Sequence, residues 1–359
     1  MQNQSVKKNN ILILTQKMDI NDPILGFFVR WVLEFAKNYE KVTVICLYEG
    51  EHNLPSNVKV LSLGKESLKI VNCKLKIAKK FIFVINFFRY IWQERKNYDK
   101  VFVHMNPIYV VLGGFFWRLR GNRLALWYTH KNIDLKLRIA EKLTNIIFSA
   151  SPESFLLKSK KLKIVGHGID TRKYPFKDDF EKRKYSVVCV GRITPIKNQK
   201  LLVEVADILV NEKGMRDLKV ALVGSFSGFD NDYYKSIKDF VDSRGLTDNV
   251  IFIGSVPNNF IHLYYYESTL SVNLAPTGGL DKVVLESLLC GTPAIALNKT
   301  FVNILRDNRL ILKNDDKNEL ADKIFSILKE GYNNKKELSD FVRENYSVVN
   351  LVKKIKQIL

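Results

Sequence analysis

Two cationic side chains, Arg192 and Lys197, lie in the segment VGRITPIKNQ, across a predicted strand-to-helix turn. Arg presents a planar pair of donors to phosphate oxygens, Lys presents a compact charge, and the N-terminus of a helix adds free amide groups. In α/β folds, ligands bind at this carboxyl edge of a sheet. The segment therefore predicts a diphosphate site, although two solvated basic residues in a loop would give the same sequence.

A second segment, NLAPTGGLDKVVLESLLCGTPAIAL, combines a glycine loop with a carboxylate on a helix. Gly278 and Gly279 would let backbone amides approach a ligand closely. The predicted helix begins near Leu280 and Asp281, and Glu286 follows one and a half turns later. A carboxylate that accepts two hydrogen bonds suits a ribose diol. The alternative is an ordinary solvated glutamate, which its apolar neighbours disfavour.

Strand-like and helical patterns alternate along the whole chain, which predicts parallel sheets covered by helices. One series runs from residue 11 to about residue 150, and a second begins at residues 185–191. The charged stretch at residues 175–184 is predicted to link them. The expected domains are residues 1–174 and 185–336, and the expected C-terminal helices cover residues 337–359.

The composition predicts a globular chain with a basic N-terminal half. The 359 residues are 46% apolar and carry a formal charge of +20, of which residues 1–170 contribute +15, with 28 Lys and Arg against 13 Asp and Glu. A polyanionic partner is therefore expected. Four cysteines lie far apart, which favours reduced thiols over a metal site or disulfides. No export signal is recognised, so the expected location is the cytoplasm.

Basic and bulky apolar residues alternate in the segment LKIVNCKLKIAKKFIFVINFFRYIWQERK. Such a composition suits a helix that lies on an anionic membrane surface. A helix that faces the domain core and exposes a basic side would have the same composition. Both interpretations remain open from the sequence.

The pairing of GRITPIK with PTGGLDKVVLESLLCGTPAIA, in this order and at this separation, resembles the family 4 glycosyltransferases of the GT-B fold. The segment HGID at residues 167–170 also resembles a family motif, usually Asn-Gly-Val-Asp. The resemblance implies two Rossmann-like domains that face each other across a cleft, with a C-terminal helix that crosses back to the N-terminal domain. The implied substrate is a nucleotide-diphosphate sugar, with no other cofactor and no metal ion.

The resemblance also implies roles for individual residues. Arg192 and Lys197 match the family's diphosphate-binding cations, and Glu286 matches the second Glu of its Glu-x7-Glu motif, which binds ribose. The loop that faces the donor sugar and phosphate, and the loops that line the base, correspond to Gly279, Leu280, Asp281, Gly224, Val256 and Pro257. The first Glu of the motif falls on Gly278, so Asp281 is the carboxylate left to contact the sugar.

In the N-terminal half, the resemblance points to a glycine loop and to one histidine, and His104 is a further candidate on the acceptor side. Gly26 and Phe27, in DPILGFFVR, match the loop on the acceptor side, and a turn without a ligand is the alternative. His130, after RLALWYT, matches the histidine that faces the donor sugar. His104, in VFVHMNP, also ends a predicted strand. A structural role is the alternative for both histidines.

The predicted function is therefore transfer of a sugar from a nucleotide-diphosphate donor to a glycan or lipid-linked acceptor in bacterial cell-surface polysaccharide synthesis. The expected reaction retains the anomeric configuration, and the protein would act in the cytoplasm or at the inner face of the plasma membrane. The alternatives are a GT-B epimerase or phosphorylase, an inactive homologue and, more distantly, a nucleic-acid-binding protein. No hydrolase, P-loop or zinc-protease motif occurs, and the pair Asp230 and Asp232 is expected to start a helix rather than to bind a metal.

Overall fold

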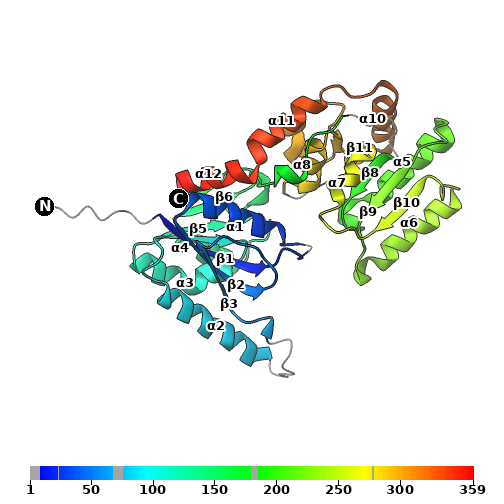
Figure 1. Cartoon of the computed structure of the whole chain (residues 1–359). Coiled ribbons are helices and arrows are strands. Elements are labelled where there is room, and N and C mark those ends of the chain that lie inside the picture. The colour runs from blue at the N-terminus through cyan, green and yellow to red at the C-terminus, as the bar shows by residue number, and fades with distance from the viewer. Residues whose placement is uncertain (1–8, 23, 68–75, 179–184, 277–278) are drawn as a thin grey trace. The chain divides into compact units, whose positions relative to one another are not determined.

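The structure is a computed structural model that describes residues 9–22, 24–67, 76–178, 185–276 and 279–359. The chain divides into two compact units (Figure 1). The N-terminal unit comprises Met1–Gly168 together with Val348–Leu359, and the C-terminal unit comprises Ile169–Ser347. Each unit contains one parallel sheet covered by helices, as the alternating sequence pattern predicts.

Within the described residues, the N-terminal unit has seven parallel strands in the order β3-β2-β1-β4-β5-β6-β7. They are β1 (Asn10–Met18), β2 (Lys41–Glu49), β3 (Val58–Ser62), β4 (Lys100–His104), β5 (Arg123–Trp127), β6 (Ile146–Ser149) and β7 (Leu162–Ile164). The central strands are continuous apolar runs because helices cover both faces of a parallel sheet. Residues 11–14 of β1, for example, have no exposed surface.

The helices of this unit are α1 (Phe27–Asn38), α2 (Lys76–Gln93), α3 (Pro107–Leu119), α4 (Leu135–Leu143) and α12 (Val348–Ile358). The chain crosses the sheet in one direction from β1 to β3 and in the other from β3 to β7. Because such crossovers are right-handed, α1 lies on one face of the sheet, and α2, α3 and α4 lie on the other. Beneath these three helices, Phe87, Trp117 and Leu126 belong to one buried core.

The last helix, α12, packs on α1 within the N-terminal unit (Figure 1). Its buried side chains are Val348, Leu351, Val352 and Ile355. Trp31 of α1 donates its indole N–H to the carbonyl of Gly168 at 3.0 Å. A Cβ atom on Gly168 would lie 2.6 Å from Leu351 and 2.9 Å from Trp31, so only glycine fits there. The predicted return of the C-terminal helix to the N-terminal domain is confirmed.

In the described part of the C-terminal unit, five parallel strands follow the order β10-β9-β8-β11-β12. They are β8 (Tyr185–Val190), β9 (Val220–Val223), β10 (Val250–Gly254), β11 (Ser268–Asn273) and β12 (Ala294–Ala296). The helices are α5 (Gln199–Asp207), α6 (Asn231–Ser243), α7 (Ile261–Tyr266), α8 (Lys282–Leu289), α9 (Val302–Leu305), α10 (Lys317–Glu330) and α11 (Lys335–Tyr346). The chain order changes direction between β8 and β11, which makes their carboxyl ends the expected ligand site.

The unit boundaries differ from the predicted domain boundaries at both ends of the C-terminal unit. Helix α11, predicted to belong to the C-terminal tail, packs on α8, and Ser339 donates to the carbonyl of Leu289 at 3.0 Å. The first part of the predicted linker also packs in this unit, since Tyr266 donates to the carbonyl of Pro175 at 2.6 Å. These long-range contacts have no local sequence signal.

Three of the cysteines, Cys46, Cys189 and Cys290, are buried free thiols, as expected from their spacing. Cys73 lies outside the described residues. Among the helices that the structure describes, none is both long enough and apolar enough to cross a membrane.

Candidate functional site

Three adjacent strands of the C-terminal unit end in glycines with positive φ angles: Gly191 after β8, Gly224 after β9 and Gly254 at the end of β10. A Cβ atom on Gly224, whose φ is +148°, would lie only 2.0 Å from the carbonyl oxygen of Gly191. Only glycine allows two backbone segments to approach so closely. The segments that follow β8 and β9 therefore run next to each other, and the Arg192 loop lies at the carboxyl edge of the sheet.

Gln199, the first residue of α5, fixes the conformation of the Arg192 loop. Its side-chain amide donates to the carbonyl of Arg192 at 2.8 Å and accepts from the amide of Thr194 at 3.3 Å. Arg192 itself is exposed, while Lys197 is half-buried. Sequence reasoning missed Gln199, although a polar residue at the buried start of an apolar helix was an available signal.

Lys197 meets Asp281, which lies 84 residues away in the sequence. The ammonium of Lys197 contacts Oδ2 of Asp281 at 2.7 Å, and the side-chain amide of Asn273 donates to the same oxygen at 3.1 Å. Asp281 makes no side-chain cap to α8, so its carboxylate is turned toward Lys197 instead. The structure thus brings together two predicted residues and adds Asn273, which was missed although it ends a buried strand with a polar side chain.

The side-chain oxygen of Asn273, Oδ1, is a buried acceptor at the same strand end. Asn273 is 4% exposed, and its Oδ1 has no hydrogen-bond partner among the described residues. An unsatisfied buried acceptor costs about 1–3 kcal/mol. A ligand hydroxyl or amide would remove that cost.

Glu286 is buried within α8, one turn after Lys282. The buried phenol of Tyr174 forms a hydrogen bond with its carboxylate. Burial raises the pKa of the Glu286 carboxyl, while the charge of Lys282 and the hydrogen bond from Tyr174 act in the opposite direction. Burial and the neighbouring carboxylate raise the pKa of Tyr174, so this phenol is a donor at neutral pH. Tyr174 was not predicted, and its only sequence signal is an aromatic residue in a charged stretch.

The remaining predicted residues of the donor loops surround this edge with varied exposure. Gly278 lies outside the described residues. The carbonyl of Gly279 accepts from the side chain of Asn298 at 3.3 Å, and Leu280 is buried beneath it. Val256 and Pro257 follow β10, with Pro257 exposed.

Asp230 and Asp232 lie at the start of α6, as predicted. Asp230 accepts from the hydroxyl of Ser227, and its side chain does not cap the helix, contrary to the capping role expected for this pair. Asp232 lies in the first turn of α6, where its charge favours the helix N-terminus. In the described part of the chain, no three His, Cys, Asp or Glu side chains are grouped as metal ligands.

In the N-terminal unit, Gly26 lies in a turn built around Asp22. Oδ1 of Asp22 accepts from the amides of Ile24 and Leu25, and its carbonyl accepts from the amide of Gly26. A Cβ atom on Gly26 would lie 2.6 Å from that carbonyl oxygen. Burial opposes ionisation of Asp22, but its hydrogen bonds with Lys17 and the backbone lower its pKa. The sequence predicted the glycine but not the residue that shapes the turn.

The two histidines of this unit lie in different surroundings. His104 is 2% exposed, stacks on Phe28 at 4.0 Å and lies 3.3 Å from the hydroxyl of Thr15 through Nδ1. These contacts pack His104 in the core of the unit, and its role on the acceptor side stays a prediction. His130 is exposed beyond β5, edge-on to Tyr128. The half-buried Phe27 lies edge-on to the ring of His104.

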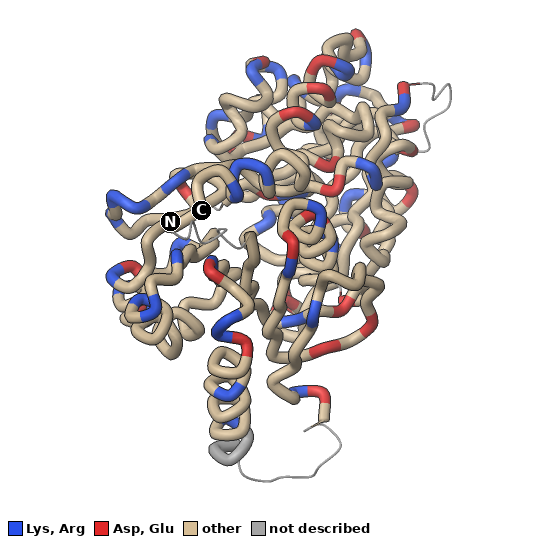
Figure 2. Tube along the Cα trace, turned by 60° about the vertical axis from the view of Figure 1, so that its left-hand side comes forward, with Lys and Arg blue, Asp and Glu red and all other residues tan. Residues whose placement is uncertain are grey.

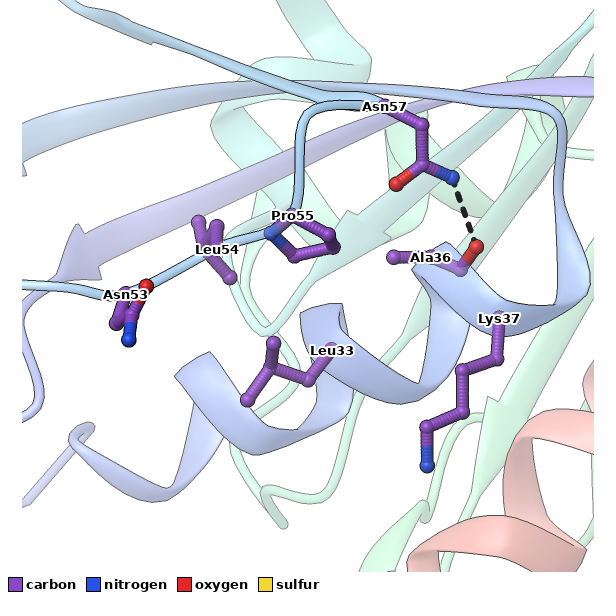
Figure 3. Close-up of a pocket in the computed structure, with 7 residues that line it drawn as sticks. All are labelled: Leu33, Ala36, Lys37, Asn53, Leu54, Pro55 and Asn57. Carbon is purple, nitrogen blue, oxygen red and sulfur yellow. Dashed lines mark hydrogen bonds between the residues drawn. The ribbon is translucent and has the colours of Figure 1, made fainter.

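A hollow of about 570 Å³ opens between α1 and the loop before β3 (Figure 3). Its apolar lining includes Leu33 and Pro55. The side-chain amide of Asn57 donates to the carbonyl of Ala36 at 2.8 Å, and Lys37 pairs with Glu34 at 2.9 Å. These polar groups are engaged with the protein, and none of the predicted site residues lines the hollow.

The comparisons with known proteins agree with the motifs. Residues 170–347 match the family model described as glycosyl transferases group 1. A D-inositol 3-phosphate glycosyltransferase from Acidothermus cellulolyticus is 26% identical over 146 residues, which are 38% of this chain and 33% of that protein. The capsular polysaccharide biosynthesis glycosyltransferase CapH from Staphylococcus aureus is 27% identical over 206 residues, 52% of this chain and 55% of CapH. The chain thus spans about a third to a half of these relatives.

A solved structure resembles the chain over nearly its whole length. HepE from Anabaena, in complex with UDP, has a TM-score of 0.73 at 16% identity and covers 97% of this chain and 99% of its own. This likeness and the two parallel sheets show the GT-B fold. The chain therefore carries a group 1 glycosyltransferase domain over residues 170–347, within a fold of the GT-B type.

Proposed function

We propose that this protein is a glycosyltransferase that moves a hexose from a nucleotide-diphosphate sugar to a glycan or lipid-linked acceptor in cell-surface polysaccharide synthesis. The main support is the convergence of Lys197, Asp281 and Asn273 at the carboxyl ends of β8 and β11. CapH, whose name places it in capsular polysaccharide synthesis, is among its relatives.

The diphosphate would lie beside Arg192 and Lys197. A Lys ammonium has three donors, so after its contact with Asp281 two remain for phosphate oxygens. Arg192 is exposed and its guanidinium can add a two-pronged contact. When the bond between the anomeric carbon and the phosphate oxygen breaks, these cations stabilise the negative charge that develops on the leaving diphosphate. We propose that this replaces a metal ion, and that no other cofactor takes part.

The ribose would be held by Glu286. Its carboxylate accepts from Tyr174 and has further lone pairs for the two hydroxyls of a ribose. Lys282, one helical turn away, favours the ionised form of Glu286 when it is protonated, and burial lowers the pKa of its own ammonium to about 7. Tyr174 and Lys282 are positioning residues in this arrangement, because they act through Glu286.

The donor sugar would meet Asp281 and Asn273. The carboxylate of Asp281 takes the part of the glutamate that Gly278 replaces, and the unsatisfied oxygen of Asn273 accepts from a donor group of the ligand. The reaction is proposed to retain the anomeric configuration, with the acceptor proton passing to an oxygen of the leaving diphosphate. Proton NMR of the product would test this, because the coupling constant of the anomeric proton reports the anomeric configuration. A product whose configuration is opposite to that of the donor sugar would contradict the proposal.

Calorimetric titration with UDP, GDP, ADP and CMP tests the proposal first. One nucleotide should bind, and Lys197→Ala should weaken it by about 10- to 100-fold, because a hydrogen bond to a charged group contributes about 1.5–3 kcal/mol. The matched control is Lys200→Ala, an exposed lysine on α5. Glu286→Gln should weaken the nucleoside and the nucleotide by the same factor, whereas Lys197→Ala should leave nucleoside binding unchanged.

The outcomes separate the alternatives. Binding of no nucleotide would overturn the proposal, and retention on DNA in its place would favour a nucleic-acid-binding protein. Binding and hydrolysis or epimerisation of the sugar, without transfer to any acceptor, would favour an epimerase. Binding without any turnover would favour an inactive homologue, as the glycine at position 278 permits.

The acceptor is proposed to be presented at the inner face of the plasma membrane. The charge of the chain supports this part of the proposal, since residues 1–170 carry +15 of the total of +20. An anionic lipid surface attracts such a unit.

A further inference from the structure

Helix α2 is apolar on its exposed side as well as on its buried side. Phe87 and Ile91 are buried in the core beneath it. Its exposed large apolar side chains recur at helical spacing and form one stripe, composed of Phe81, Ile82, Ile85, Phe88 and Trp92. A helix that is apolar all round is normally covered by other protein or by lipid.

Large apolar side chains are also exposed on the two helices that follow α2 in the sequence. Phe115 and Leu119 are exposed one turn apart on α3, and Leu135 and Ile139 are exposed one turn apart on α4. Helices α3 and α4 pack together on the same face of the sheet as α2. We call the exposed apolar side chains of these three helices the α2–α4 face.

A shallow hollow joins α2 to α3 within this face. Its volume is about 350 Å³, and Phe88, Trp92 and Phe116 are among its lining residues. The rings of Trp92 and Phe116 lie 6.1 Å apart. The apolar surface therefore continues from α2 onto α3.

The segment that carries the α2–α4 face has a large positive net charge. Residues 76–143 contain 14 Lys and Arg and only four acidic residues, and α2 contains none of the latter. The four acidic side chains all have contacts within the unit, as Glu94 with Lys59, Asp99 with the amide of Asn10, Asp134 as the cap of α4 and Glu141 with Ser159. Figure 2 shows blue and tan positions, without red, along the coil of α2.

Arginines border the aromatic side chains of the face. The guanidinium of Arg95 lies 4.4 Å from the ring centre of Trp92, that of Arg89 4.9 Å from Tyr90, and that of Arg120 5.7 Å from Phe116. Aromatic rings with cations beside them are typical of the zone where acyl chains meet headgroup phosphates.

We propose that the α2–α4 face is a docking surface for an anionic lipid bilayer, with Trp92 and its apolar neighbours inserted at the level of the headgroups. The inference specifies the surface through which the proposed glycosyltransferase would reach a membrane-bound acceptor. A second copy of the chain is the poorer occupant. A symmetric contact would place this basic face against its own equivalent, and like charges repel across an interface.

Tryptophan fluorescence gives a direct test, because the four tryptophans of the chain differ in exposure. Trp31, Trp117 and Trp127 are buried, and Trp92 is 57% exposed. Vesicles that contain phosphatidylglycerol should therefore shift the emission to shorter wavelength at low ionic strength, and brominated lipids should quench it. Phosphatidylcholine vesicles should produce a much smaller change.

Vesicle flotation with variants sharpens the test. Ile85→Gln combined with Phe88→Gln should lower the partition coefficient by more than tenfold, and Lys80→Gln combined with Arg89→Gln by about 25-fold, at about fivefold for each basic side chain. The control is Phe229→Ser, a fully exposed aromatic residue of the C-terminal unit, which should partition like the unchanged protein. All these positions are exposed, and circular dichroism checks that the variants fold.

The inference would be overturned if the unchanged protein stayed in solution with anionic vesicles, or if the variants floated equally well. A dimer in light scattering that Ile85→Gln dissociates would assign the face to a second copy and equally overturn it. None of these measurements uses a nucleotide sugar, so their failure leaves the proposed transfer reaction standing. Conversely, loss of nucleotide binding would not affect vesicle binding.

Discussion

We call the carboxyl ends of β8 and β11, with Lys197, Asp281 and Glu286, the donor edge of the C-terminal unit. The donor edge and the α2–α4 face of the N-terminal unit differ in what holds their side chains. At the donor edge, Lys197, Asp281 and Glu286 are each held by a hydrogen-bonded partner from a distant part of the sequence. On the α2–α4 face, Ile85 and Leu119 lie on the surface of helices without cover. The first arrangement orders charges for a small polar ligand, and the second leaves apolar area for an extended surface.

Under the two proposals, one fold supplies two kinds of recognition. A phosphate group is bound by a few preorganised donors, whose geometry must be fixed before the ligand arrives. A bilayer is fluid and requires only apolar area and positive charge, so no internal network is needed. The two regions should therefore respond to different changes.

Removal of α12 should have the largest effect, and it should be confined to the N-terminal unit. Deletion of residues 348–359 uncovers α1 and removes four buried aliphatic side chains, worth about 1.5–3 kcal/mol each. This approaches the whole stability of a typical domain. We expect the tryptophan emission to lose its native, short-wavelength character, because the N-terminal unit contains all four tryptophans. Nucleotide binding by the C-terminal unit should persist. Loss of both signals would show that the units do not fold independently.

Gly224→Ala should have the next largest effect, in the C-terminal unit. The new Cβ atom would overlap the carbonyl of Gly191, and the φ of +148° is strained for alanine, so a loss of about 3 kcal/mol or more is expected. Gly245→Ala, with φ of +67° and open space around the Cβ position, is the matched control and should cost about 1 kcal/mol. Urea unfolding followed by far-ultraviolet circular dichroism measures both. Equal costs would argue against the close approach of the two strand ends.

The pH dependence of nucleotide affinity should show the smallest effect. In the proposed complex the ionised Glu286 accepts from ribose. Burial raises its pKa above the ordinary 4.5, so affinity should fall as the pH decreases through the raised pKa. The affinity should begin to fall at a higher pH than it would for an ordinary carboxyl group. Below the raised pKa, it should fall by up to about tenfold per pH unit. Titration between pH 5 and pH 8, at pH values set with about half-unit steps, would measure it.

Glu286→Gln is the control for this prediction, because a glutamine side chain does not titrate. Its affinity should be lower, and the fall at acidic pH that belongs to Glu286 should be missing. A remaining change near pH 7 would belong to Lys282, because burial lowers the pKa of that ammonium to about 7. A pH dependence that survives in Glu286→Gln would assign the titration to another group, such as the phosphate of the ligand. Vesicle binding through the α2–α4 face should not follow this pH profile.

The sequence predicted most of the donor edge because its residues lie in two short segments with local signals. Glycines at strand ends, cations at a strand-to-helix turn and a carboxylate on an apolar helix are all visible within about ten residues. Tyr174 escaped prediction because its role depends on Glu286, more than 100 positions away. Gln199 and Asn273 contact residues only five to eight positions away, and a polar side chain at the buried end of an element does not by itself identify its partner. No local periodicity encodes such contacts.

The sequence by itself determined the fold class, the family resemblance and the one-sided charge, because apolar periodicity, short motifs and residue counts are local properties. Only the tertiary structure decided that His104 is a core residue, that Lys197 meets Asp281, and that α11 and α12 belong to different units. It also decided that α2 has an uncovered apolar side. Burial depends on which residues the fold places around a side chain. A sequence pattern shows that a residue is apolar, but it does not show whether other residues pack over it.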